Sequence, residues 1–176
     1  MTESVDQMLD AFAEATAWVE NAVRFVVECP TTKGEDLAPV VFLYRDGEIQ
    51  LPPRLMLDEG IEDEQAKERI IAWLKNLLEE EEADGYFLVN EAYAISTTDK
   101  TLYDEAVRIG VRNMPGRKEI ANIIAVCRDP ATRKLLVIGL SQCDIIRIDE
   151  TNRITGVWES IGASDFDYRH LVTEWD

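Results

Sequence analysis

The hydrophobic pattern of the chain is most distinctive between Glu119 and Gln142, where two apolar runs of strand length flank a turn built on Asp129-Pro130. Runs rich in Ile and Val on both sides of such a turn predict a β-hairpin. Neither run alternates cleanly, and strands that are apolar on both faces are usually central and covered on both sides. We therefore expect a hairpin over 119–142 in the middle of a sheet. Its first strand divides into two faces, with Ile120, Ile124 and Val126 on one and Ala121, Ile123, Ala125 and Cys127 on the other.

Two longer segments repeat apolar residues at helical spacing. Residues 3–28 predict an amphipathic helix that stops before Pro30, because the residue before a proline avoids the helical region. Residues 62–82 predict a second helix. Trp18 and Phe25 widen the apolar face of the first helix, so 3–28 either contacts two layers of its own fold or forms an oligomer contact.

The remaining apolar runs are short and predict further strands. Pro52-Pro53 ends one of them, and a proline pair suits the edge of a sheet. We expect one α+β domain over residues 1–176, with a mostly antiparallel sheet of about six or seven strands and the two helices packed on it. The expected strands, besides the hairpin, are 38–44, 49–51, 85–96, 143–149 and 153–158.

Charge narrows the range of partners. The formal net charge is −17, from 35 acidic against 18 basic residues. Such a charge disfavours contact with nucleic acid phosphates and with anionic lipid, so we expect no direct nucleic acid binding and no membrane association. An unknown protein partner fits the composition better.

Three sequence features predict a cytoplasmic location. No segment approaches the roughly 20 apolar residues that span a bilayer. The first residues are acidic and lack the basic start of a signal peptide. Cys29, Cys127 and Cys143 are odd in number and form no Cys-x-x-Cys motif, which favours a reducing compartment.

Residues 97–118 form a long connection between predicted strands, with one or two helical turns expected around 102–109. Connections of this length are often functional or mobile. From Lys100 to Lys118 there are five basic residues and two acidic ones, so this segment carries +3 and the rest of the chain −20. The predicted binding residues are Arg108, Arg112, Arg117 and Lys118.

The best candidate for chemistry combines Glu91, Arg117 and Glu119. A regular strand over 85–96 places Glu91 among apolar neighbours, where a carboxylate needs a partner or a proton. Arg117 reaches the start of the hairpin beside Glu119. The three residues fit an acid/base site. They fit equally a structural ion pair that locks the long connection onto the sheet, a role that suits the planar fork of arginine.

The run Phe-Leu-Val-Asn-Glu-Ala-Tyr at 87–93, followed by Pro-Gly-Arg-Lys-Glu at 115–119, resembles a pattern in small bacterial and phage proteins. In that pattern a strand ending in Glu-Ala and an aromatic residue precedes a Pro-x-Arg-x-Glu segment. The resemblance covers roughly residues 85–140 and implies that Glu91, Arg117 and Glu119 belong together. It implies no activity.

No complete catalytic, metal or cofactor motif is present. The single histidine, His170, and three scattered cysteines do not supply a zinc site, and glycine-rich nucleotide-binding patterns are absent. We therefore expect no metal and no cofactor, and a non-catalytic protein-binding or regulatory module, to which the resemblance adds the expectation of a phage-related protein. One alternative is a hydrolase- or lyase-type enzyme that uses Glu91 or Glu119 with Arg117. The other is a DNA mimic that blocks a nucleic-acid-binding protein.

Overall fold

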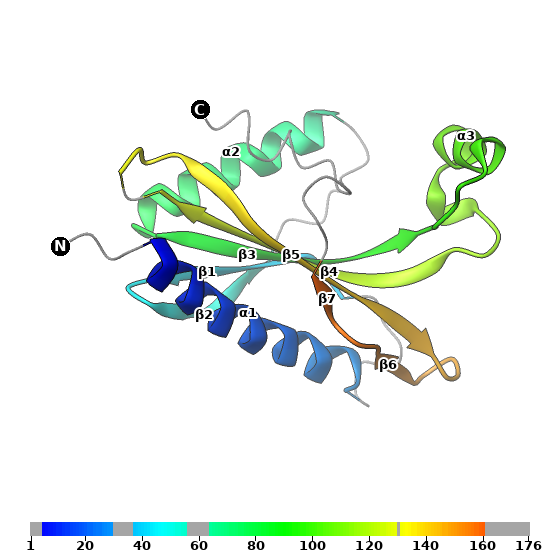
Figure 1. The fold of residues 1–176 in the computed structure, drawn as a ribbon, viewed down its shortest axis with the longest axis horizontal. Coiled ribbons are helices and arrows are strands. Elements are labelled where there is room, and N and C mark those ends of the chain that lie inside the picture. The colour runs from blue at the N-terminus through cyan, green and yellow to red at the C-terminus, as the bar shows by residue number, and fades with distance from the viewer. Residues whose placement is uncertain (1–4, 30–36, 56–63, 130, 161–176) are drawn as a thin grey trace.

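The computed structural model describes residues 5–29, 37–55, 64–129 and 131–160. Within them, seven strands form one antiparallel sheet in the order β2-β1-β3-β4-β5-β6, with β7 also paired to β5. The α+β prediction is confirmed (Figure 1). The elements are α1 (Val5–Val27), β1 (Val40–Arg45), β2 (Glu48–Leu55), α2 (Glu64–Glu80), β3 (Gly85–Ala94), α3 (Lys100–Ile109), the 3-10 helix η2 (Val111–Asn113), β4 (Lys118–Arg128), β5 (Leu135–Arg147), β6 (Arg153–Thr155) and β7 (Glu159–Ser160).

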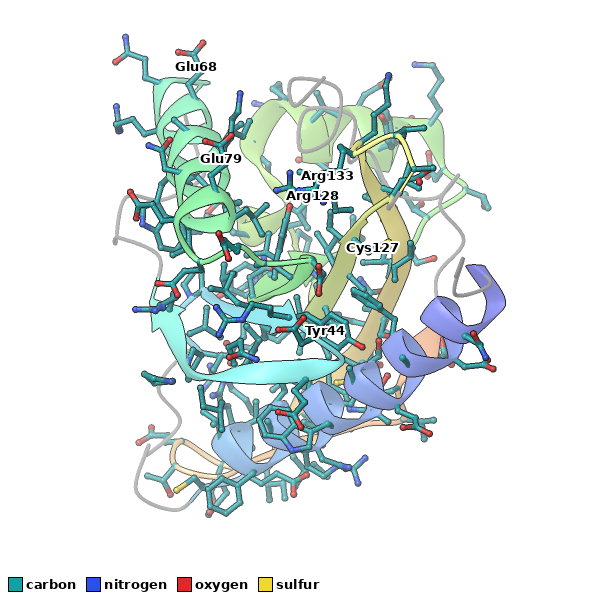
Figure 2. The ribbon with its side chains drawn as sticks, turned by 90° about the vertical axis from the view of Figure 1, so that its left-hand side faces the viewer. Tyr44, Glu68, Glu79, Cys127, Arg128 and Arg133 are labelled. Carbon is teal, nitrogen blue, oxygen red and sulfur yellow. The ribbon has the colours of Figure 1, made fainter. Side chains whose placement is uncertain are left out.

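The two long helices lie on opposite sides of the sheet. Figure 2 shows α1 and α2 separated by the strands, with Tyr44 directed toward the α1 side. The ring of Phe12 on α1 lies 4.3 Å from the ring of Tyr44, measured between centroids. Strand β4 is therefore enclosed between two helical layers, as its apolar run predicts. Strand β5 is only partly covered, because most of its residues are half-buried or exposed and Leu136 is 42 % exposed.

Each face of the sheet has its own hydrophobic core, and β4 contributes to both. Its residues 120–127 are all buried. The division between faces follows the sequence prediction. The α1 core contains Phe12, Val19, Val23, Phe87, Val89, Ala121, Ile123, Ala125 and Cys127, and the α2 core contains Leu74, Leu78, Tyr86, Leu88, Ile124, Val126 and Leu140.

Two strand predictions need correction. The expected break between Gln142 and Cys143 does not exist, because β5 runs without interruption from Leu135 to Arg147. The prolines at 52–53 do not end their strand, which continues through them to Leu55. Both prolines are tolerated because β2 is an edge strand, as predicted, and its pairing with β1 shifts register between Val41 and Leu43.

The C-terminal end of α2 carries four consecutive glutamates, which are unfavourable at the negative end of a helix dipole. Two arginines of the β1–β2 hairpin offset this. Arg54 Nη2 lies 2.9 Å from Glu81 Oε1, and Arg45 Nη1 donates a hydrogen bond to the Glu81 carbonyl oxygen. In contrast, Glu68 and Glu79 are exposed on α2 (Figure 2). The acidic end of α2 is thus partly neutralised by the chain itself.

None of the helices in the described ranges is long and apolar enough to cross a membrane.

The three cysteines are free, and they differ in burial. Burial raises the pKa of the Cys127 and Cys143 thiols to about 11. Both are therefore protonated and shielded at neutral pH, whereas Cys29 is half-buried near the end of α1. We expect a thiol-reactive disulfide reagent to label Cys29 in the native protein, and Cys127 and Cys143 only after unfolding. Mass spectrometry of labelled peptides with and without urea measures this, and rapid native labelling of Cys127 would contradict the fold.

The raised thiol pKa values also predict a loss of stability in alkali. In the unfolded chain these thiols ionise near their usual pKa of about 8.5, but in the folded chain only near 11. Between these values the unfolded state binds fewer protons, so the free energy of unfolding decreases as pH rises. Urea unfolding at about pH 8 and about pH 10 tests this. Cys127→Ala should reduce the pH dependence, and an unchanged pH dependence in this variant would contradict the prediction.

Candidate functional site

The α1 face of the sheet changes from apolar to charged toward the end of β3. On β3, Phe87 and Val89 belong to the α1 core, and the alternation of the strand directs Glu91 and Tyr93 to the same face. The register places Tyr93 opposite Glu119 of β4. Glu91 and Glu119 therefore share one face of neighbouring strands, as expected from the sequence.

Glu91 is neutralised by an arginine that lies 62 residues further along the chain. Arg153 Nη1 donates to Glu91 Oε1 at 2.7 Å, and the two side chains are 1 % and 11 % exposed, respectively. This ion pair joins β3 to β6. The β6 end is also held by α1, because Thr155 donates its backbone N–H to Glu28 Oε1 and its hydroxyl oxygen accepts from Arg24 Nε. The pair is thus part of the packing of α1 against the sheet.

Glu119 has a different partner. Arg147 Nε lies 2.8 Å from both carboxylate oxygens of Glu119, which links β4 to the end of β5. Both side chains are partly exposed, in contrast to the Glu91–Arg153 pair. The two carboxylates of the predicted acid/base site are therefore each bonded to a separate guanidinium group.

Arg117 does not form the expected pair with Glu91. Its guanidinium carbon lies 5.2 Å from the centre of the Tyr93 ring, and its Nη1 donates to the Met114 carbonyl oxygen at 3.4 Å. The reason is the strand register. Arg117 immediately precedes β4, where the facing residues of β3 are Tyr93 and Ala94, while Glu91 faces Ala121 further along. Arg117 therefore fixes the base of the long connection by a cation–π contact.

This arrangement is better suited to holding strands together than to acid/base chemistry. A general base must reach the proton that it abstracts. At Glu91 the Arg153 guanidinium occupies one carboxylate oxygen, and the pair is buried. Arg147 similarly occupies both oxygens of Glu119. The sequence analysis missed Arg147 and Arg153; the only local signal is that each basic side chain alternates with isoleucine in a strand.

The long connection folds into a compact unit, the α3 head, which we define as residues 99–114. Asp99 caps α3 by accepting from the Thr101 N–H at 2.8 Å, and Gly110 ends it with a φ of 84° that favours glycine. Ala106 and Met114 form its buried side. Figure 1 shows the head beyond the ends of β3 and β4, away from α1 and α2. The connection thus contains more helix than the one or two turns that the sequence predicts, because α3 and η2 together span most of residues 100–113.

The exposed side of the head combines apolar residues with charged residues of both signs. Tyr103 and Val107, one helical turn apart, are 61 % and 70 % exposed. Of the predicted binding residues, Arg108 lies 3.8 Å from Glu105, and Lys118 lies 3.3 Å from Asp144 at the base of the head. Arg112 in η2 and Arg117 are exposed. The structure thus places Arg108 and Arg112 on the head, and Arg117 and Lys118 at its base.

In the part of the chain that the structure describes, no group of three or more His, Cys, Asp or Glu side chains is placed to hold a metal ion. Comparison with protein-family models, with curated proteins and with solved structures finds no match to this chain. The resemblance to small bacterial and phage proteins therefore stays a prediction.

Proposed function

We propose that this protein is a non-catalytic protein-binding or regulatory module whose contact element is the α3 head. The observation that supports this most directly is the exposure of Tyr103 and Val107 on a unit that stands apart from the helices covering the sheet. An apolar pair within the basic segment 100–118 offers both a desolvated contact and charge selectivity. Neither residue belongs to the two hydrophobic cores, so packing within the described fold does not explain why these positions are apolar.

The partner surface complementary to the segment 100–118, which includes the basic residues at the base of the head, is acidic and apolar. The segment 100–118 carries +3. Within the head, Asp104 and Glu105 are already paired with Lys100 and Arg108. A protein that presents carboxylates around an apolar side chain is the natural complement, because charge complementarity directs the encounter and apolar burial stabilises the complex.

The enzyme alternative is less well supported. It depends on a carboxylate that substrate and solvent can reach, and Glu91 is covered together with Arg153. The DNA-mimic alternative places the contact on the acidic body and not on the head. The two binding proposals therefore predict different mutations that abolish binding: substitutions on the head in one case and substitutions on the acidic body in the other.

A photo-crosslinking experiment tests the proposed role of the head. A photoreactive phenylalanine analogue replaces Val107 in one protein and Leu51, an exposed residue of the edge strand β2, in a matched control. Illumination in a cell lysate should give a discrete crosslinked protein from position 107 that is absent from position 51. Neutralising Arg108, Arg112 and Arg117 to Gln should reduce its yield about tenfold, which corresponds to about 1.4 kcal/mol.

Circular dichroism and urea unfolding of the triple variant confirm that it remains folded. Equal crosslinking from both positions, or an undiminished yield in the triple variant, would contradict the proposal. Crosslinks only from acidic positions of the body, to a protein that added DNA displaces, would favour the DNA-mimic alternative instead.

A further inference from the structure

The first part of strand β5 pairs with a neighbouring strand on one side only. β5 pairs with β4 along that side, and on its other side β6 pairs with residues 145–147 and β7 with residues 141–142. In the ranges that the structure describes, no strand pairs with this other side of residues 135–140, which we call the open edge. Its sequence is Leu-Leu-Val-Ile-Gly-Leu. An apolar strand edge with unpaired backbone N–H and C=O groups is a template for a further strand.

Strand β7 leads the chain directly to this open edge. Its two residues pair with β5 in antiparallel orientation, and Ser160 lies opposite Ser141. In an antiparallel pair, each later residue of one strand lies opposite an earlier residue of the other. A strand that continues β7 in this register would bring Ile161 opposite Leu140, and the residues up to 166 would reach the remaining positions of the open edge in turn. The chain after Ser160 thus starts beside the edge and runs along it.

The charge at the far end of the open edge is complementary to the same segment. Between Arg128 and Lys134 there are three basic residues and one acidic residue, so the β4–β5 turn carries +2. Arg128 and Arg133 both lie at this turn (Figure 2), and Arg128 Nε is buried without a hydrogen-bond partner among the described residues. Residues 161–168 contain Asp165 and Asp167 and no basic residue. In the register of β7 these two carboxylates would approach the basic turn, where they can pair with the guanidinium groups.

We propose that residues 161–166 of this chain are the occupant of the open edge and extend β7 along β5. A segment joined to the sheet at Ser160 is present at the edge at a much higher effective concentration than a free peptide or a second copy of the chain. The added strand also protects the edge from pairing with other chains. Because Gly162, Ala163 and Asp165 are poor strand formers, the pairing is weak and depends on the charges at its end. It involves a different surface from the α3 head.

NMR spectra of the full chain test the proposed register. Antiparallel pairing should give short Hα–Hα contacts between residues 161–166 and residues 135–140, in the order that continues the Ser160–Ser141 pair. The double variant Asp165→Lys with Asp167→Lys should weaken these contacts and speed amide exchange within the open edge about tenfold. Asp10→Lys with Glu14→Lys, two exposed positions of α1, makes the same change in net charge and should leave the exchange unaltered.

Disulfide trapping distinguishes the chain's own segment from a second copy. Leu136→Cys, at a 42 % exposed position of the open edge, is combined with Asp165→Cys in a Cys29→Ser background. Oxidised glutathione should then give a disulfide within one chain, which runs as a monomer on a non-reducing gel. Leu51→Cys with Asp165→Cys places the first thiol on β2, at the other edge of the sheet, and should form this disulfide at least about tenfold more slowly.

Three results would overturn the proposal. The first is the absence of Hα–Hα contacts between 161–166 and the open edge in the wild type. The second is equally fast trapping of Asp165→Cys by the thiols at positions 51 and 136. The third is a covalent dimer as the main product of the Leu136→Cys, Asp165→Cys variant, which would assign the edge to the segment of a second copy. None of these results bears on the crosslink from position 107, so the proposed function of the α3 head is tested separately.

Discussion

Replacing Arg153 by alanine is expected to lower the free energy of unfolding by about 3–5 kcal/mol, because it leaves the Glu91 carboxylate buried without its charged partner. The size of the effect follows from burial, since the Arg153 side chain is only 1 % exposed. Urea unfolding monitored by tryptophan fluorescence measures the change.

Two variants make this prediction specific to the buried pair. Arg147→Ala breaks the more exposed pair with Glu119 and should cost no more than about 1 kcal/mol. The double change Glu91→Leu with Arg153→Met replaces both charges by apolar groups and should recover most of the stability. Equal losses for Arg153→Ala and Arg147→Ala would show that Glu91 and Arg153 are not a buried pair.

Replacing Gly85 by alanine is expected to destabilise the protein by about 3 kcal/mol or more, because the new methyl group has no space. A Cβ at this position would lie 2.3 Å from the Val126 carbonyl oxygen and 3.0 Å from both Cys127 Cα and Phe12 Cζ. The first two neighbours are backbone atoms of β4, so β3 and β4 must separate to accommodate it. Urea or thermal unfolding measures the loss.

Gly139→Ala is the matched control for this prediction. Gly139 also lies in a strand, on β5 opposite Ala125 of β4, but the nearest atom to its added Cβ is Ala125 Cβ at 3.8 Å, an ordinary van der Waals contact. We expect the free energy of unfolding of this variant to lie within about 1 kcal/mol of that of the wild type. If both alanine variants were equally stable, the close approach of β3, β4 and α1 at Gly85 would be wrong.

The central part of the fold could be predicted because its signal is local. Runs of Ile and Val around an Asp-Pro turn identify the β4–β5 hairpin, and the lack of alternation in the first run indicates the cover on both faces that β4 has. The same holds for the edge position of β2, which follows from its prolines. Such patterns report the environment of each residue directly, because burial on one or both faces determines which side chains a strand can carry.

The partner of Glu91 could not be predicted in the same way. Burial of Glu91 follows from its apolar neighbours on β3, but its ion pair with Arg153 spans 62 residues and depends on how β6 meets α1. Proximity in sequence favoured Arg117, which the register instead places beside Tyr93. The continuous β5 was missed for a related reason, because Ser141 and Gln142 suggest a break when their neighbours in the sheet are unknown.

The α3 head shows a further limit of prediction from sequence. Apolar residues at helical spacing normally predict a buried face, and Leu102, Tyr103 and Val107 fit that pattern. Only the structure shows that the buried face of α3 is formed by Ala106, while Tyr103 and Val107 face outward. Exposure of an apolar residue is a property of what the rest of the chain leaves uncovered, so no local sequence pattern reports it.

The central claim is that a doubly covered sheet carries a separate head, and native-state hydrogen exchange followed by NMR tests it most directly. The amides of residues 120–127 in β4 should exchange only through global unfolding, with the same free energy as urea unfolding gives. The amides of α3 should exchange through local opening at a clearly lower free energy, because the head has few buried apolar side chains. Equal protection of α3 and β4, or local exchange within β4, would contradict the account.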